Sequence, residues 1–434
     1  MKYTYKVHLN RHLMAFIVIV SLAMNFTHLQ AVSIQSADSL KFVSVRGHII
    51  SSEDQEPVVF ASVFMDSLNI GTVSNSEGRF LFKVPLTYKH LPIVVSSLGY
   101  KKKYIYLSDI REGQNKIELE PAIIPIEEVT IKRIDPLVLM DLAVQNIALN
   151  YSKDPVAMTG FYREAIKKNR NYISVGEAVL DIYKASYKKL SDLDRVQIHK
   201  GRKSQNINKS DTIFMKFQGG PLLISSLDLV KNPGIILSKE EFQFYNYTLN
   251  GIVDIGGREA YLVWFSPKKN SPYHTHEGNI YIDIESYAIV NLELEVSKDK
   301  TGEATKALVK KKPLGFDIRL QDAKYLVSYR MIGNIWYVNY ARVELTFRCK
   351  WPKKLFASNF MIVSEAVITD MDPANVIKPR ARESLKKTSI FSEEVSNFED
   401  PDYWGASNVI EPESSIQEAI AKINKKLTKK QQRN

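Results

Sequence analysis

Cysteine is nearly absent from this 434-residue sequence, in which Cys349 is the only one. A single thiol cannot form an intramolecular disulfide, and it excludes zinc or iron–sulfur sites built from several cysteines. The sequence also lacks a His-Glu-x-x-His motif, a Gly-x-Ser-x-Gly turn and a phosphate-binding glycine loop. The alternating pattern of residues 343–351 predicts an ordinary strand position for Cys349 rather than a nucleophile. We therefore expect a protein that is not an enzyme and has no cofactor.

Histidine is scarce as well, with eight residues in the chain. His274 and Glu277 form a His-x-x-Glu pair, which zinc carboxypeptidases use together with a third histidine far downstream. No histidine follows His276, so that third zinc ligand is missing. A zinc site needs three protein ligands in tetrahedral geometry. Between Pro272 and Gly278 the pair is expected to lie in a hairpin loop, with adventitious metal binding as the lesser alternative.

Long apolar runs are confined to the amino terminus. A basic start is followed by an apolar run of about twelve residues, 13–24, which suits a signal peptide better than a membrane span. We expect residues 1–31 to be the signal peptide, with cleavage after Ala31 or, as the alternative position, Ala23. The competing interpretation is a membrane anchor that is retained at the amino terminus. The protein is then exported to the periplasm or to the periplasmic face of the outer membrane.

The charge is moderately basic, with 59 Lys+Arg against 48 Asp+Glu and a formal net charge of +11. Removing the three basic residues of the signal leaves 56 against 48, a net charge of +8. Lysines gather in residues 298–312 and in the tail from Glu411. Such patches can contact anionic lipid or simply face solvent. No nucleic-acid-binding motif is present, so we expect envelope proteins or lipids, and not nucleic acid, as partners.

Residues 42–120 carry the pattern of a small β-sandwich, with short strands separated by turn signals about every eight to twelve residues. The turn 74–78 supplies an Asn and a Gly that tolerate left-handed backbone angles. Along this segment the chain contains Val45-Arg46-Gly47, Pro57, Ala61-Ser62-Val63, Gly71-Thr72, Asn75-Ser76-Glu77-Gly78-Arg79-Phe80, Gly99-Tyr100 and Ile117-Glu118-Leu119, then the exit segment 126–131. This order resembles the carboxypeptidase-regulatory-like domain family.

The resemblance covers about 85 residues and implies a prealbumin-like sandwich of seven strands, with no peptidase activity in this module. The family commonly precedes other modules in envelope proteins of Gram-negative bacteria. The resemblance to TonB-dependent receptors of that compartment stops at this domain, because the remaining chain lacks the features of a large outer-membrane barrel. A linker is expected over residues 121–134.

Residues 135–370 are predicted to form a helix followed by a curved antiparallel sheet, a half-barrel. Asp135-Pro136 is a helix start, and Leu137, Met140, Val144, Ile147 and Tyr151 follow at helical spacing. In 289–296 apolar and polar residues alternate, which predicts one dry and one wet face. The hairpin at 281–286 is similar to one in periplasmic lipoprotein-carrier folds, whose curved sheet holds acyl chains. Such a concave face holds either an apolar ligand or the chain's own helices.

The remainder is predicted to be an irregular extension, 371–410, and an amphipathic helix, 411–430. Ser415 and Glu418 suggest a capping box, and Ile416, Ile420 and Ile423 follow at helical spacing. This helix is expected to pack on the sheet or, through its basic face, to contact a membrane surface peripherally.

Three hypotheses about function follow. In the first, a non-enzymatic envelope protein combines an interaction or scaffolding sandwich with a half-barrel that binds a hydrophobic or lipid ligand. The second is a purely structural or protein-binding envelope component whose half-barrel is filled by its own helices. The third, a hydrolase, would need perturbed carboxylates or histidines gathered in one cleft. Asp283 and Glu285 are too close in sequence to establish such a cleft.

Overall fold

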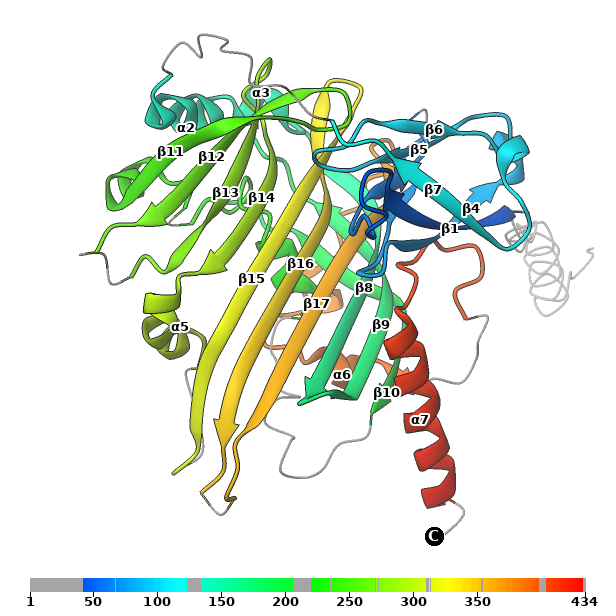
Figure 1. Ribbon diagram of the computed structural model, residues 1–434, viewed down its shortest axis with the longest axis vertical. Coiled ribbons are helices and arrows are strands. Elements are labelled where there is room, and N and C mark those ends of the chain that lie inside the picture. Colours follow the sequence, from blue (N-terminus) through cyan, green and yellow to red (C-terminus); the bar gives the residue numbers. More distant parts are fainter. Residues whose placement is uncertain are drawn as a thin grey trace, which may run out of the picture. The chain divides into compact units, whose positions relative to one another are not determined.

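The computed structural model describes residues 42–66, 68–122, 134–205, 220–234, 236–269, 271, 273–309, 312, 314–352, 354–397 and 403–431 (Figure 1). The predicted signal peptide with its cleavage position after Ala31, and most of the predicted linker 121–134, lie outside the described residues. Apart from Phe42, the elements below belong to one unit, Val43–Asn434.

The first seven strands form two small sheets that pack face to face. One sheet has the order β4-β1-β7 and the other the order β3-β2-β5-β6. Phe80, Phe82 and Val84 alternate along β4 and are completely buried between the sheets, as their spacing predicts. The predicted seven-strand sandwich is confirmed. Its strands are β1 (Phe42–Ser51), β2 (Ser62–Phe64), β3 (Gly71–Val73), β4 (Arg79–Pro85), β5 (Ile93–Ser96), β6 (Lys103–Ile105) and β7 (Gln114–Leu119).

The third and largest sheet of the described residues contains eleven strands in the order β11-β12-β13-β14-β15-β16-β17-β8-β9-β10-β18. Its first ten strands are antiparallel and curve without closing, and β18 adds a short parallel pairing to β10 (Figure 1). The predicted curved antiparallel sheet is confirmed. The strands are β8 (Val156–Lys168), β9 (Asn171–Lys184), β10 (Arg195–Gln205), β11 (Tyr245–Asp254), β12 (Glu259–Pro267), β13 (His276–Asp283), β14 (Ile289–Val296), β15 (Asp317–Ile332), β16 (Ile335–Lys350), β17 (Ser358–Asp372) and β18 (Ser396–Asn397).

The order of these strands differs from a simple meander. After β10 the chain restarts at the far edge with β11, and the last long strand, β17, returns to pair with β8. Pairing between β17 and β8 extends from Phe360 with Lys168 to Asp372 with Ala157. The middle of the sheet is therefore formed by strands that are distant in sequence.

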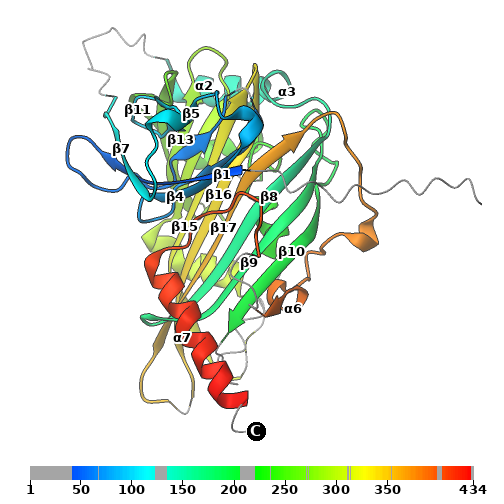
Figure 2. The same ribbon diagram turned by 90° about the vertical axis from the view of Figure 1, so that its right-hand side faces the viewer.

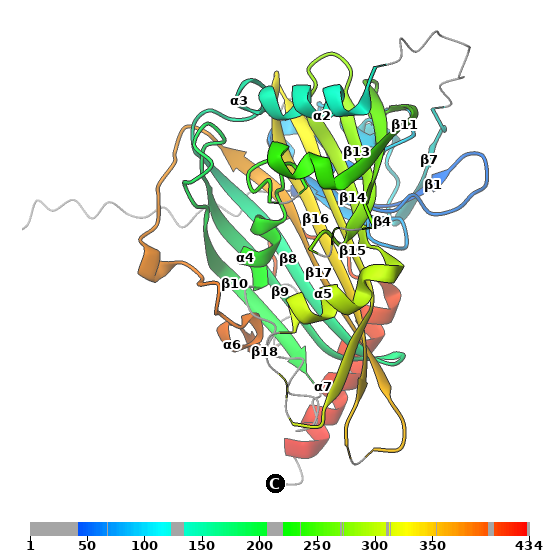
Figure 3. The same cartoon turned by 90° about the vertical axis from the view of Figure 1, so that its left-hand side faces the viewer.

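The inner face of the sheet, which we define as the concave face, is covered by short helices (Figure 3). They are α2 (Pro136–Gln145), α3 (Ile147–Asn150), α4 (Gly220–Ser226), η5 (Lys239–Phe244) and α5 (Thr301–Leu308). Asp135 caps α2 by accepting the N–H of Leu137 at 2.9 Å, as predicted. No helix of the described residues is long and apolar enough to cross a membrane.

The predicted apolar stripe of the first helix is partly wrong. Leu139, Met140 and Ala143 are the buried residues of α2, whereas Leu137 is 44% exposed. The helix ends at Gln145, and a separate turn, α3, buries Ile147. Seven apolar residues within 137–144 offer more than one helical stripe, and packing on the sheet selects among them.

The outer, convex face carries the sandwich, the C-terminal strap (residues 403–413) and α7 (Ser414–Gln431) (Figure 2). Ile416 and Ile423 of α7 are buried, and Ile416 packs with Ala165 and Val175 of the sheet. The apolar side of this helix therefore faces protein. Before the strap the chain contains η7 (Ala381–Glu383) and α6 (Phe391–Glu394).

The predicted capping box of α7 is wrong. The helix begins at Ser414, and the carboxylate of Glu77 in the sandwich accepts the Ser414 N–H at 3.1 Å and its hydroxyl at 3.0 Å. Ser415 instead lies 3.4 Å, Oγ to hydroxyl, from Tyr172. The cap thus comes from a distant part of the chain, which local spacing cannot reveal.

Candidate functional site

The inner face is filled by the chain's own side chains. One continuous apolar core joins the helices α2 and α3 and the segment 230–242 to the concave residues of the sheet. Beneath α4 lies an apolar void of about 40 Å³, lined by residues that include Met158, Leu180 and Ile368. Sites for small ligands measure roughly 300–1,000 Å³. The void is therefore too small for a lipid as the chain is arranged here.

A buried polar cluster fastens the inner segments to the sheet. The Lys184 ammonium lies 2.8 Å from Asp194 and 2.6 Å from Asp228, and all three side chains are at most 7% exposed. Asp228 also accepts the hydroxyls of Tyr187 at 2.5 Å and Tyr329 at 2.8 Å. Each charge has close partners, so the cluster serves structure, since a buried charge is tolerated when it is paired and hydrogen-bonded.

Glu164 is a buried carboxyl on the inner face, and among the described residues no cation is a cause of its pKa shift. Burial raises the pKa of Glu164 to about 7, and the hydroxyl of Tyr162 lies 3.0 Å from its Oε2. Phe391 of α6 packs edge-on against Tyr162, with ring centroids 4.8 Å apart. The carboxyl is thus sealed within the core.

The outer face contains an ion network centred on Arg163, whose side chain is 2% exposed. Its guanidinium contacts Glu177 at 3.0 Å, Glu365 at 3.2 Å and Glu413 at 3.8 Å. It also donates to the carbonyl oxygen of Ile410 in the strap at 2.5 Å. Neighbouring arginines complete the network, because Arg202 reaches Glu177 at 3.2 Å and Arg342 reaches Glu365 at 2.8 Å. The network fixes the strap to the sheet.

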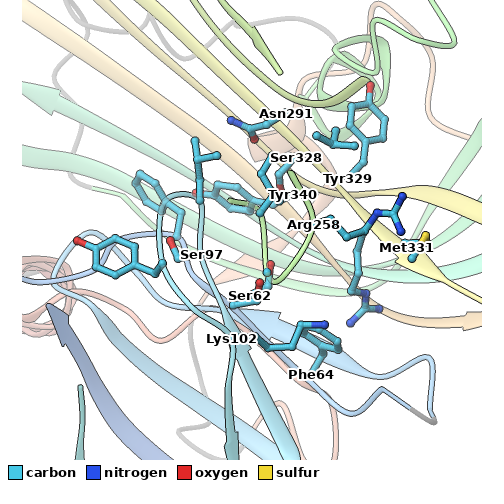
Figure 4. A pocket seen from close by; sticks show the side chains of 18 of the residues that line it. Ser62, Phe64, Ser97, Lys102, Arg258, Asn291, Ser328, Tyr329, Met331 and Tyr340 are labelled. Atoms are coloured by element: carbon cyan, nitrogen blue, oxygen red, sulfur yellow. The ribbon is translucent and has the colours of Figure 1, made fainter. Parts of the chain in front are cut away.

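A cavity lies between the sandwich and the outer face of the sheet (Figure 4). It is a cleft of about 700 Å³. One wall comes from the sandwich, with Ser62, Phe64 and Lys102, and the floor comes from β14 and β15. This volume lies within the usual range for a small-molecule site. We therefore treat the cleft as the candidate site.

The floor of the cleft carries a row of polar side chains. Asn291 of β14 pairs directly with Ser328 of β15, and Arg330 follows two residues later. Because side chains alternate between the faces of a strand, these three share the outer face. Asn291 is 6% exposed and lines the cleft. Figure 4 shows Asn291 and Ser328 side by side.

Arg330 is buried at the edge of this row, with 7% of its surface exposed. Its Nη2 donates a long hydrogen bond of 3.5 Å to the carbonyl oxygen of Asn69, and its guanidinium carbon lies 4.9 Å from the ring centre of Phe64. Its buried Nε has no hydrogen-bond partner in the described chain. Burial lowers the pKa of Arg330 to about 10, although the charges of Asp66 and Asp370 raise it. A Cβ at Gly71 would lie 2.7 Å from its Nη1.

Two other features shape the cleft. Phe60 has a backbone φ of +55°, which is unusual for a bulky residue, and its ring stacks on Tyr340 with centroids 5.4 Å apart. Such backbone strain persists only where the surroundings hold it. At the other end of the cleft, Arg258 donates to Asp283 at 2.7 Å and contacts Glu285 at 2.8 Å. Lys102 of the sandwich also lines the cleft.

The structure gives different partners to His274 and Glu277, the pair that the sequence had suggested for zinc. His274 lies 2.7 Å, Nε2 to Oε2, from Glu241, whereas Glu277 accepts the hydroxyl of Ser297 at 2.7 Å. Burial lowers the pKa of His276 to about 4 and raises that of Cys349 to about 12. Within the described ranges, no group of three His, Cys, Asp or Glu side chains could hold a metal ion.

Residues 45–131 match the protein family described as the CarboxypepD_reg-like domain. The resemblance predicted for the first domain is confirmed. A comparison with curated proteins finds no match.

Three solved structures are similar to part of the chain. A DUF1329 family protein from Desulfovibrio piger has 15% sequence identity and a TM-score of 0.24, covering 56% of this chain and 96% of the other. A LolA superfamily protein from Nitrosomonas europaea has 10% identity and a TM-score of 0.22, with coverages of 58% and 98%. MucB, in complex with MucA(peri), has 12% identity and a TM-score of 0.18, with coverages of 56% and 100%.

Proposed function

We propose that this chain is an exported, non-catalytic envelope protein that binds its ligand in the cleft between the sandwich and the outer face of the sheet. In this proposal the half-barrel is a platform filled by its own helices, and the sandwich is the interaction module. The periplasm or the periplasmic face of the outer membrane is the proposed location, supported by the amino-terminal sequence pattern and by the domain that residues 45–131 match.

One observation carries the proposal: the two faces of the sheet differ in the space they leave. The inner face and its helices form one apolar core with a void of about 40 Å³, whereas the outer face borders a cleft of about 700 Å³. Within the described residues, the helices on the concave face pack against its apolar side chains in one core. The polar floor of the cleft instead suits a polar ligand.

The non-catalytic part of the proposal is supported by how the buried charges are used. Lys184, Arg163 and Arg258 each lie within 3.2 Å of carboxylates that they neutralise. Among the described residues that line the cleft there is no histidine or cysteine. Its floor carboxylate, Glu293, accepts the hydroxyl of Tyr281 at 3.0 Å.

The experiment is a titration of the purified protein with 11-(dansylamino)undecanoic acid, a fluorescent acyl probe. We expect no saturable binding, because the inner face is filled. Leu180→Trp, which would occupy the void under α4, and Ser328→Trp, which would occupy the cleft, are the matched variants. Saturable binding that Leu180→Trp removes and Ser328→Trp leaves intact would overturn the proposal and establish a hydrophobic-ligand carrier.

A further inference from the structure

Arg330 is a buried cation whose charge is incompletely balanced. The two carboxylates that act on it most strongly, Asp66 and Asp370, are both exposed to solvent. The guanidinium makes one long hydrogen bond, to Asn69, and its Nε makes none within the described residues. A buried charge without a close counter-charge costs several kcal/mol. An anionic group entering the cleft would offset part of that cost.

The neighbouring floor residues offer neutral hydrogen-bonding groups. An amide such as that of Asn291 can both donate and accept, and so can the hydroxyl of Ser328. The serines of the facing wall, Ser62 and Ser97, add further hydroxyls. The acidic floor residue Glu293 is already engaged, because it accepts from the Tyr281 hydroxyl at 3.0 Å.

The spacing of the row limits the length of the ligand. Two residues along a strand span about 6.6 Å, and adjacent strands lie about 4.8 Å apart. The distance from Arg330 past Ser328 to Asn291 therefore matches one sugar ring that bears a carboxylate. A guanidinium suits such a carboxylate because it can donate two parallel hydrogen bonds.

The floor is the face of a sheet and not its edge. The backbone groups of β14 and β15 already pair with each other, from Asn291 with Ser328 to Glu295 with Lys324. An extended peptide would need unpaired backbone groups at a sheet edge. A ligand that brings its own hydroxyls has no such requirement.

We infer that the cleft binds an acidic sugar unit, with its carboxylate on Arg330 and its hydroxyls on Ser328 and Asn291. This inference rests on the proposed function, because it specifies the ligand of the same cleft. The unit can belong to an envelope polysaccharide or to a free uronic acid, since the recognised chemistry is the same.

The test is isothermal titration calorimetry of the full protein with D-glucuronate, D-glucose, trigalacturonate and sodium sulfate. We expect glucuronate to bind at least tenfold more tightly than glucose. Arg330→Gln should remove this preference, and Asn291→Ala, which leaves the guanidinium in place, should weaken glucuronate at least threefold. Ser52→Trp on an exposed part of the sandwich is the matched control for Ser328→Trp and should bind like the unaltered protein.

The outcomes distinguish a failure of the sugar assignment from a failure of the proposed function. Binding of trigalacturonate at least tenfold more tightly than glucuronate supports a polysaccharide source, and equal binding supports the free acid. Sulfate binding as tightly as glucuronate, with no effect of Asn291→Ala, overturns the sugar assignment. A lack of saturation by every acidic sugar also overturns it. If a different ligand is then bound by the protein and lost in Ser328→Trp, the proposed function stands while this inference fails.

Discussion

Replacing Arg163 by methionine would remove the central cation of the outer-face network while keeping a side chain of similar length. Three carboxylates, those of Glu177, Glu365 and Glu413, would lose a partner within 3.8 Å. Glu177 and Glu365 would each keep one other arginine. Among the described side chains, Glu413 would keep the hydroxyl of Ser76 at 2.9 Å.

Removing one partner of a buried ion network costs about 3–5 kcal/mol, because it leaves uncompensated charge behind. We expect Arg163→Met to lower the free energy of unfolding by this amount at pH 7, measured by urea titration. Burial would raise the pKa of Glu365, but the Arg342 and Arg163 guanidinium groups outweigh burial and hold it below its ordinary value. A carboxyl with a depressed folded pKa stabilises the fold above its unfolded pKa, and this contribution is lost as the pH falls through the folded value.

The difference between the unaltered protein and Arg163→Met should therefore shrink as the pH falls below about 4.5. Arg202→Met is the matched control. It makes the same change at another arginine that contacts Glu177, but that carboxylate would retain Arg163, so we expect a smaller loss. A cost below about 1 kcal/mol for Arg163→Met, or an equal cost at pH 4 and pH 7, would refute the electrostatic reasoning.

Three further predictions concern the core and the C-terminal helix. Lys184→Met should cost about 3–5 kcal/mol in urea unfolding at pH 7, because it leaves two buried aspartates unpaired; a cost under about 1 kcal/mol would contradict this. Burial raises the folded pKa of Glu164 to about 7, so its stabilising contribution is present below the unfolded pKa and is lost as the pH rises through 7. Glu164→Gln should therefore raise stability at pH 8, by up to roughly 3 kcal/mol, and change it little at pH 4, and equal thermal shifts at both pH values would be evidence against this. Replacing Ile420 and Ile423 by serine should lower stability without changing sedimentation with anionic vesicles, and loss of vesicle binding at unchanged stability would place the helix on the membrane instead.

Much of the fold could be predicted because its signals are local. The turn at 74–78 and the alternation of Phe80, Phe82 and Val84 define a strand of the sandwich without reference to the rest of the chain. Similarly, the alternation in 292–296 distinguishes the buried apolar residues of this part of β14 from its two half-buried glutamates. The signals of turn chemistry and side-chain period act over a few residues, so they survive in a single sequence.

The order of the strands in the large sheet could not be predicted in this way. Nor could the packing of the sandwich, the strap and α7 on its outer face. Pairing of β17 with β8 depends on contacts about 200 residues apart, and antiparallel strands of similar length offer many partners. Arg163 and Glu164 are neighbours in β8, so they point to opposite faces, and both are buried although adjacent charges in a strand predict exposure. On the outer face the charge of Arg163 is paired with carboxylates, whereas on the inner face burial raises the pKa of Glu164 to about 7.

The candidate site was missed for a related reason. Arg330 and Asn291 lie in strands whose alternation predicts a solvent-facing side, so their polarity needed no further explanation. Only the packing of the sandwich on that side turns them into the floor of a cleft. Arg330 is the one charged residue in the run 325–332, whose other residues are aromatic or apolar apart from Ser328, and this was the available signal.

The central claim, that the inner face is filled by the chain itself and the ligand lies in the outer cleft, is tested most directly by native mass spectrometry. The protein would be purified gently from an exporting host and its organic extract analysed for acyl species. The account predicts a mass without a bound lipid and an extract without a stoichiometric acyl component. A one-to-one acyl species that remains bound in Ser328→Trp would contradict it.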